Sequence, residues 1–99
     1  MHLDELQQLM VTTYGLRDTE RGVAATIAWL TEELGELAQA VRKGTREQQL
    51  HELGDVLAWL ASLAAQLDLS MSDAVQRYAQ GCPACHDSPC TCVDLSIRS

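Results

Sequence analysis

The sequence contains no phenylalanine, and aromatic residues make up only 4% of its 99 residues. Leu, Ala and Val must therefore build most of any hydrophobic core. The chain also lacks a long apolar run. The longest, from Val56 to Ala65, is interrupted by Ser62 and falls far short of the roughly 18–20 residues that a membrane span needs. No segment alternates polar and apolar residues with the period of a half-buried strand. These absences argue against a membrane protein and against a β-sheet fold.

Basic side chains are also scarce. The chain has 7 Lys and Arg against 14 Asp and Glu, a formal net charge of −7. This balance makes nucleic acid and an anionic membrane poor partners. A nucleotide remains a possible ligand if metal ions stand between carboxylates and phosphates. The residues from Met1 to Glu5 lack the positive charge and the apolar run of a signal peptide, so we expect a cytoplasmic protein.

Helical periodicity accounts for most of the chain. We predict a first helix from about Leu3 to Tyr14, with Gly15 as the stop, and a second from Asp18 or Thr19 to Lys43, before Gly44. A third helix begins with a capping box at Thr45–Gln48, and a short fourth helix follows Ser70 and stops at Gly81. Apolar side chains recur at steps of three and four in the two long helices, at Val23, Ile27, Leu30, Leu34, Leu37 and Val41 and at Leu50, Leu53, Leu57, Leu60, Ala64 and Leu67. Both stripes are expected to face the core.

The domain organisation follows from this pattern. Residues 1–81 should form one helical domain, and residues 82–99 a compact tail that holds both prolines and all four cysteines. The predicted fold class is all-α, an antiparallel bundle of about four helices. Because so short a chain has a thin core and its long helices would expose apolar surface, we expect homo-oligomerisation, as a dimer or tetramer, to complete the bundle.

Two pairs of acidic residues lie at helical spacing. Glu33 and Glu36 share a face of the second predicted helix, and Glu52 and Asp55 share a face of the third. If these helices form an antiparallel hairpin about Gly44, Glu36 faces Glu52 and Glu33 faces Asp55. Four carboxylates at one level repel one another, so they must take up protons or bind a hard divalent cation.

All-oxygen ligands favour Mg²⁺ or Mn²⁺ over other metals. A di-iron centre is disfavoured, because neither pair contains the histidine of a Glu-x-x-His motif. The alternative is a solvated helix face, which an isolated Glu-x-x-Glu usually is. The same hairpin register places Trp29 opposite Trp59, where the two rings either fill the seam or stack a nucleobase.

The tail contains four thiols within eleven residues, at Cys82, Cys85, Cys90 and Cys92. Tetrahedral zinc coordination by all four, or by three of them with His86, is sterically reasonable. Two disulfides or free thiols are the alternatives. Zinc is favoured because thiols usually stay reduced in the cytosol.

The spacing Glu32-Glu33-x-x-Glu36, fifteen intervening residues and Glu52-x-x-Asp55 resembles the signature of the MazG-like nucleoside triphosphate pyrophosphohydrolases, members of an all-α pyrophosphatase superfamily. The resemblance covers roughly residues 19–80 and extends to the apolar residues around both motifs. The cysteine-rich tail also looks like one found on a compact branch of that family.

The resemblance implies hydrolysis of an NTP or dNTP to the monophosphate and pyrophosphate, with Mg²⁺ or Mn²⁺ as cofactor. It implies that the metal ligands are Glu33, Glu36, Glu52 and Asp55. Glu32 would be the general base or the carboxylate that orients water.

Contacts to the substrate are harder to assign, because cations are few. The candidates are Trp29 and Trp59 for the base, and Lys43, Arg46 and Arg77 for the phosphates, with Arg21 as a further option. Arg77 stands where the family often carries a lysine. A helical adaptor that binds a nucleotide or a partner without turnover is the main alternative function. A third is an interaction module built on a zinc tail, in which the acids only solvate a helix.

Overall fold

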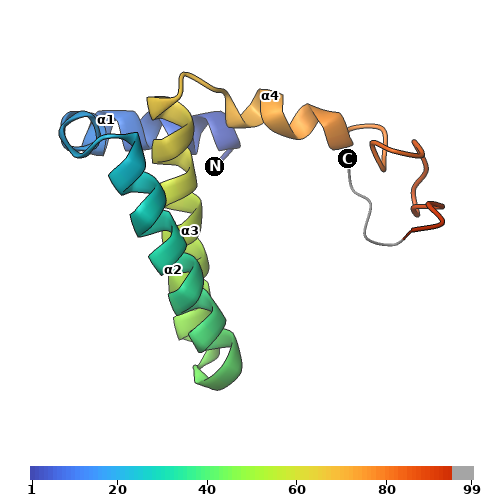
Figure 1. Cartoon of the computed structure of the whole chain (residues 1–99), viewed down its shortest axis with the longest axis horizontal. Coiled ribbons are helices and arrows are strands. Elements are labelled where there is room, and N and C mark those ends of the chain that lie inside the picture. The colour runs from blue at the N-terminus through green and yellow to red at the C-terminus, as the bar shows by residue number, and fades with distance from the viewer. Residues whose placement is uncertain (95–99) are drawn as a thin grey trace.

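The computed structural model describes residues 1–94, and its regular elements over that range are all helices, as predicted (Figure 1). Its elements are α1 (Leu3–Arg21), α2 (Val23–Lys43), α3 (Arg46–Gln66), α4 (Met71–Val75) and the 3-10 helix η1 (Gln76–Tyr78). Over the described residues, no helix combines the length and the apolarity that a membrane crossing requires.

Helices α2 and α3 form the predicted antiparallel hairpin (Figure 1). A Cβ on Gly44 at the turn would lie 2.8 Å from the carbonyl oxygen of Ala40, so the turn requires glycine. The capping box of α3 is confirmed. The Gln48 backbone N–H donates to the Thr45 hydroxyl at 3.2 Å, and the Thr45 N–H donates to the Gln48 side chain at 2.8 Å.

The predicted boundary between the first two helices is wrong. Helix α1 continues through Gly15 to Arg21, so Asp18 and Thr19 lie near the end of α1 and do not begin α2. The break falls at Gly22, whose φ of 83° is accessible to glycine without strain. Gly15 only weakens a helix, by roughly 0.5–1 kcal/mol relative to alanine, which packing offsets.

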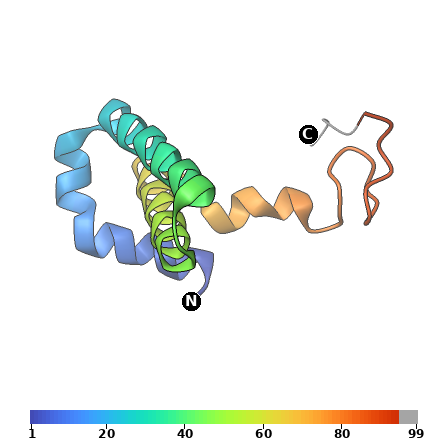
Figure 2. The ribbon, with the colours of Figure 1, turned by 90° about the horizontal axis from the view of Figure 1, so that it is seen from below.

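Helix α1 packs across the end of the hairpin that lies away from the Gly44 turn (Figure 1). The Gln66 side chain on α3 donates to the Asp18 carbonyl at 2.7 Å and ties the two helices together. Gln7 on α1 bonds in turn to the Leu69 carbonyl and the Met71 N–H. The predicted fourth helix ends at Val75, continues as η1, and leads the tail away from the hairpin (Figures 1 and 2).

The two apolar stripes do not face the core of the single chain as predicted. Only four apolar side chains among the described residues are buried, namely Leu30, Ala40, Val56 and Ala61. Leu34, Leu53 and Leu57 are 49%, 46% and 38% exposed. The reason is that α3 packs on one edge of the α2 stripe, where Thr26, Leu30 and Ala40 are buried.

Exposed apolar residues therefore cover one side of the hairpin, which we call the apolar face; its members are Ile27, Leu34, Val41, Leu50, Leu53, Leu57 and Leu60. At about 100° per residue, Trp29 and Glu36 lie on the other side of the buried row of α2. The hairpin thus presents the apolar residues and the acidic residues on opposite faces.

Candidate active site

The hairpin brings the predicted carboxylates together. Ligand oxygens of Glu33, Glu36 and Glu52 lie within 4.8 Å of one another. Asp55 belongs to a second group of the same tightness, with Glu52 and His51. Nε2 of His51 lies 3.3 Å from Oδ2 of Asp55, one helical turn along α3. The sequence analysis did not assign His51, although its i,i+4 spacing to Asp55 was visible. Glu52 is common to the two groups and lies at their centre.

Two of these carboxylates lack the partners that a stable buried acid needs. Oε2 of Glu33 and Oε2 of Glu52 are shielded from solvent and have no hydrogen-bond partner among the described residues. Burial raises the pKa of Glu33, and the charges of Glu36 and Asp55 raise it further. Burial also raises the pKa of Glu52, with Glu36 as the next cause. A divalent cation coordinated by these shielded, unpartnered oxygens would compensate their charge.

We expect this repulsion to appear as a pH-dependent stability difference between the metal-free protein and its Glu33→Gln variant. The raised pKa means that folding favours protonated Glu33, so wild-type stability is lost as the pH rises from the ordinary value of 4.5 through the raised pKa. The melting temperature of the variant should therefore exceed that of the wild type by little at pH 4.5 and by more at pH 7. Added Mg²⁺ should shrink the gap at pH 7. A melting-temperature difference that becomes smaller from pH 4.5 to pH 7 in the absence of metal would contradict the expectation.

Glu32, the predicted base, is exposed on α2 beside this cluster and belongs to neither group of ligand oxygens. An exposed carboxylate next to the cluster remains open to solvent water. Its placement is compatible with taking a proton from water.

The tryptophans meet as the hairpin register predicts. The rings of Trp29 and Trp59 stack at 13° with centroids 6.1 Å apart. The guanidinium of Arg21 lies 4.7 Å from the centroid of the Trp59 ring and pairs with buried Asp18 at 2.5 Å. A cavity of about 220 Å³ between α1 and α3 is lined by Arg21, Trp59 and Asp55, with Tyr14 among its other walls. The sequence analysis named Arg21 but missed Tyr14 and Asp18, because it placed Asp18 at the start of the next helix.

The candidate phosphate contacts are dispersed. Lys43 lines a second cavity, of about 410 Å³, together with Glu36 and Glu52. Arg46 begins α3 and is exposed, and it does not line that cavity. Arg77 lies over the Tyr78 ring at 5.4 Å within η1, which extends away from the hairpin (Figure 1). Of the three cations, only Lys43 shares a cavity with the acids.

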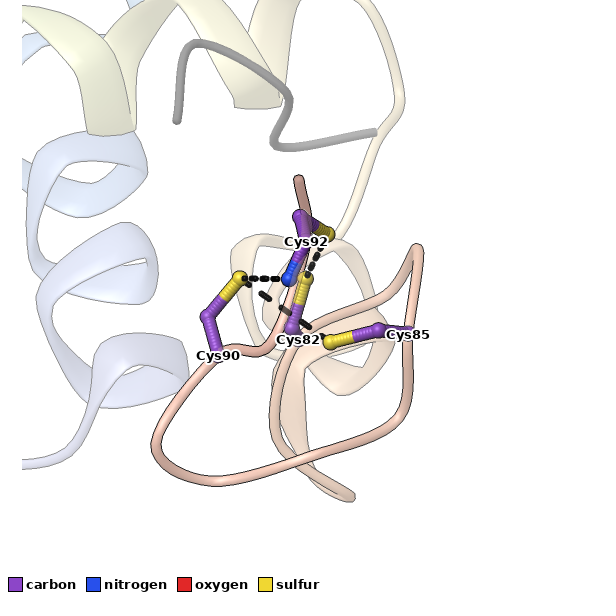
Figure 3. A group of neighbouring side chains, drawn as sticks. All are labelled: Cys82, Cys85, Cys90 and Cys92. Carbon is purple, nitrogen blue, oxygen red and sulfur yellow. Dashed lines mark hydrogen bonds between the residues drawn. The ribbon is translucent and has the colours of Figure 1, made fainter. Parts of the chain in front are cut away.

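The four cysteine sulfurs in the tail form one cluster, within 4.8 Å of one another (Figure 3). None of the four is in a disulfide. The sulfurs of Cys82 and Cys92 are 3.7 Å apart, and those of Cys85 and Cys90 are 3.9 Å apart. Sulfurs at about 2.3 Å from a tetrahedral Zn²⁺ would lie about 3.8 Å from each other, so the spacing fits zinc. His86 is exposed and does not belong to the cluster.

Backbone geometry holds these sulfurs in place. Gly81 has a φ of 95°, and a Cβ on it would lie 2.8 Å from the Asp87 carbonyl oxygen, so only glycine fits at the entry to the loop. The Thr91 N–H donates to Cys85 Sγ. This hydrogen bond and a second one from the Asp87 backbone lower the pKa of Cys85 to about 6. The sulfurs of Cys90 and Cys82 raise the pKa of Cys92 to about 12. Without a cation to share, four neighbouring thiols do not all ionise.

The chain was compared with known proteins. Residues 21–86, more than half of the chain, match the family described as the MazG nucleotide pyrophosphohydrolase domain. A search of curated proteins gave no match. The matched segment contains both acidic pairs of the hairpin, and both groups of clustered ligand atoms around Glu52 lie inside it. The chain therefore belongs to the MazG nucleotide pyrophosphohydrolase family.

Proposed function

We propose that the protein is a metal-dependent nucleoside triphosphate pyrophosphohydrolase, which converts an NTP or dNTP and water into the monophosphate and pyrophosphate. Family membership supports nucleotide pyrophosphohydrolase activity in general. The observation that carries the finer assignment is the pair of shielded, unpartnered oxygens on Glu33 and Glu52, within a cluster of carboxylates. Unpaired buried charge of this kind destabilises a small fold. A bound cation therefore explains these carboxylates better than a purely structural role does.

The residues that would hold Mg²⁺ or Mn²⁺ are Glu33, Glu36, Glu52 and Asp55. When bound, a divalent ion neutralises phosphate charge and lowers the pKa of a coordinated water. His51 is placed to orient Asp55 through their 3.3 Å contact.

Glu32 is the residue to which we assign proton transfer. Water attacks the α-phosphorus, and a new P–O bond forms as the bond from that phosphorus to the bridging oxygen breaks. Pyrophosphate leaves with the bonding electron pair, and the water proton passes to the Glu32 carboxylate. Its exposed position beside the cluster allows it to return the proton to solvent.

A direct assay tests this function. The full chain is incubated with the common NTPs and dNTPs and either Mg²⁺ or Mn²⁺, and pyrophosphate and monophosphate are measured together. Both products should form in equal amounts and only with metal. Nucleotide binding without products after long incubation would instead support the non-catalytic adaptor.

We further propose that the protein works as a homo-oligomer, a dimer or a tetramer. The support is the contrast between a buried core of four apolar residues among those described and the broad apolar face of the hairpin. A second copy offers a self-complementary surface for that face. Because the acids lie on the opposite side, such pairing leaves the carboxylates accessible to a nucleotide.

The cysteine cluster is proposed as a structural zinc site, with Cys82, Cys85, Cys90 and Cys92 as the ligands. The sulfur spacing and the backbone N–H groups that donate to Cys85 and Cys90 support it. A cytoplasmic location, which we also propose, would keep the thiols reduced and available to the metal.

Protein purified without added metal is expected to contain about one equivalent of zinc per chain. Cys82→Ser removes one ligand and should lose most of that zinc by elemental analysis. His86→Ala is the matched control within the same loop, and it should keep its zinc because His86 lies outside the cluster. Less than about half an equivalent in the wild type, with oxidised thiols, would contradict the assignment.

A further inference from the structure

Two cavities flank the carboxylates on the acidic side of the hairpin. Asp55 lines the cavity between α1 and α3, and Glu36 and Glu52 line the cavity near the turn. Along α3, the lining residues run from Gln48 near the turn to Ser62 near α1, about 21 Å at the usual helical rise of about 1.5 Å per residue. The acids therefore stand between two separate binding spaces, which a long, thin ligand can occupy together.

The cavity beside α1 has walls suited to a flat ring. Tyr14, Trp59 and Arg21 all line it, with the Trp59 ring held between Trp29 and the Arg21 guanidinium. Aromatic rings and arginine planes are the groups on which proteins stack nucleobases. Its volume of about 220 Å³ is below the roughly 300–1,000 Å³ of pockets that enclose a whole drug-sized ligand, so it suits one end of a nucleotide.

Charge makes the same cavity unfavourable for phosphates. The positive charge of Arg21 is already paired with Asp18, whose side chain is 7% exposed. Asp55 adds a further negative charge on the wall. The guanidinium keeps N–H groups beyond the paired Nη1, and these can donate to ring acceptors of a base.

The cavity near the turn differs in its walls and not in the sign of its charge. No aromatic residue lines it, and its polar walls are Lys43, the amides of Gln39 and Gln48, and the carboxylates of Glu36 and Glu52 that would hold the metal. A lysine and amide donors are the groups that bind a phosphate chain. Lys43 is seven residues from Glu36 on α2, so its backbone lies about 10 Å nearer the turn.

We propose that the substrate lies along the hairpin in one direction, with its nucleoside in the cavity of Tyr14 and Arg21 and its departing pyrophosphate at Lys43. This inference rests on the proposed function and specifies its two subsites. The bond that breaks would then lie over the carboxylates between them. Tyr14 and Arg21 select the nucleoside, and Lys43 binds the leaving group.

Separate titrations of the two product halves test this orientation. Calorimetry with Mg²⁺ present measures the binding of inorganic pyrophosphate and of AMP, GMP, CMP and UMP to the wild type and to two variants. Lys43→Met should weaken pyrophosphate about tenfold and leave the best-bound monophosphate within about twofold. Tyr14→Ala should do the reverse, with about tenfold weaker monophosphate and unchanged pyrophosphate.

Matched variants separate these effects from folding. Arg42→Met removes a neighbouring exposed cation outside the cavity and should leave both affinities unchanged. Tyr14→Phe keeps the ring and should restore monophosphate binding. The orientation is overturned if Lys43→Met or Tyr14→Ala weakens both ligands equally, or if neither ligand binds the wild type. It is also overturned if Lys43→Met weakens only the monophosphate and Tyr14→Ala only pyrophosphate. Selective losses in a protein that releases no pyrophosphate from any triphosphate would defeat the proposed catalysis and leave the two subsites standing.

Discussion

Replacing Glu52 with Gln is expected to lower pyrophosphate release by at least about a hundredfold, the scale on which the loss of one placed electrostatic group acts. Glu52 is the one residue common to both groups of clustered ligand atoms, so a single amide weakens both at once. One of its oxygens is shielded and unpartnered, and an amide cannot supply the charge that a divalent cation needs there.

The control is Glu47→Gln, which makes the same change in the exposed first turn of the same helix. It should retain wild-type activity. Without metal at pH 7, Glu52→Gln should melt at a higher temperature than the wild type, because burial and Glu36 raise the pKa of Glu52 and its charge opposes folding. It should also gain less stability from added Mg²⁺. Wild-type turnover in a folded Glu52→Gln variant would show that the chemistry takes place elsewhere.

A Leu57→Glu variant is expected to separate the oligomer into monomers. Leu57 lies on the apolar face and is 38% exposed in the single chain. Because only 38% of Leu57 is left to bury, each copy would lose up to about 1 kcal/mol of leucine burial at the interface. Each copy would also bury a charge, which is the larger cost. Because a symmetric interface contains the change twice, the dissociation constant should rise by roughly a thousandfold or more.

Sedimentation equilibrium over a range of concentrations measures this effect. Leu16→Glu is the matched control, because Leu16 is 86% exposed but lies on α1, away from the apolar face. It should keep the mass of the wild-type oligomer. If the wild type itself sediments as a monomer at all concentrations, the apolar face has another occupant and the proposed oligomer is wrong.

The sequence predicted the hairpin and its register well, because both depend on local signals. A glycine at the turn and a capping box at Thr45 set where α2 ends and α3 begins, and the antiparallel register then brings Trp29 to Trp59. The convergence of Glu33, Glu36 and Glu52 follows from the same register.

The errors arose where a local signal has two physical outcomes. Glycine either ends a helix or is tolerated within one, and only the φ at Gly22 distinguishes it from Gly15. A stripe of apolar residues indicates a buried face, but it does not say whether the same chain or a second copy covers it. The cavity beside α1 could not be foreseen, since it depends on how α1 crosses α3.

The single face that α1 presents to its cavity has an evolutionary consequence. Met10, Tyr14, Asp18 and Arg21 recur at helical spacing, and all of them line the same wall. One inserted or deleted residue between Tyr14 and Asp18 would turn the preceding part of the helix by about 100° and replace Tyr14 in the wall with a different side chain. The carboxylates on α2 and α3 would not move. The selectivity of such a protein can therefore diverge through the length of one helix while its hydrolytic residues stay the same.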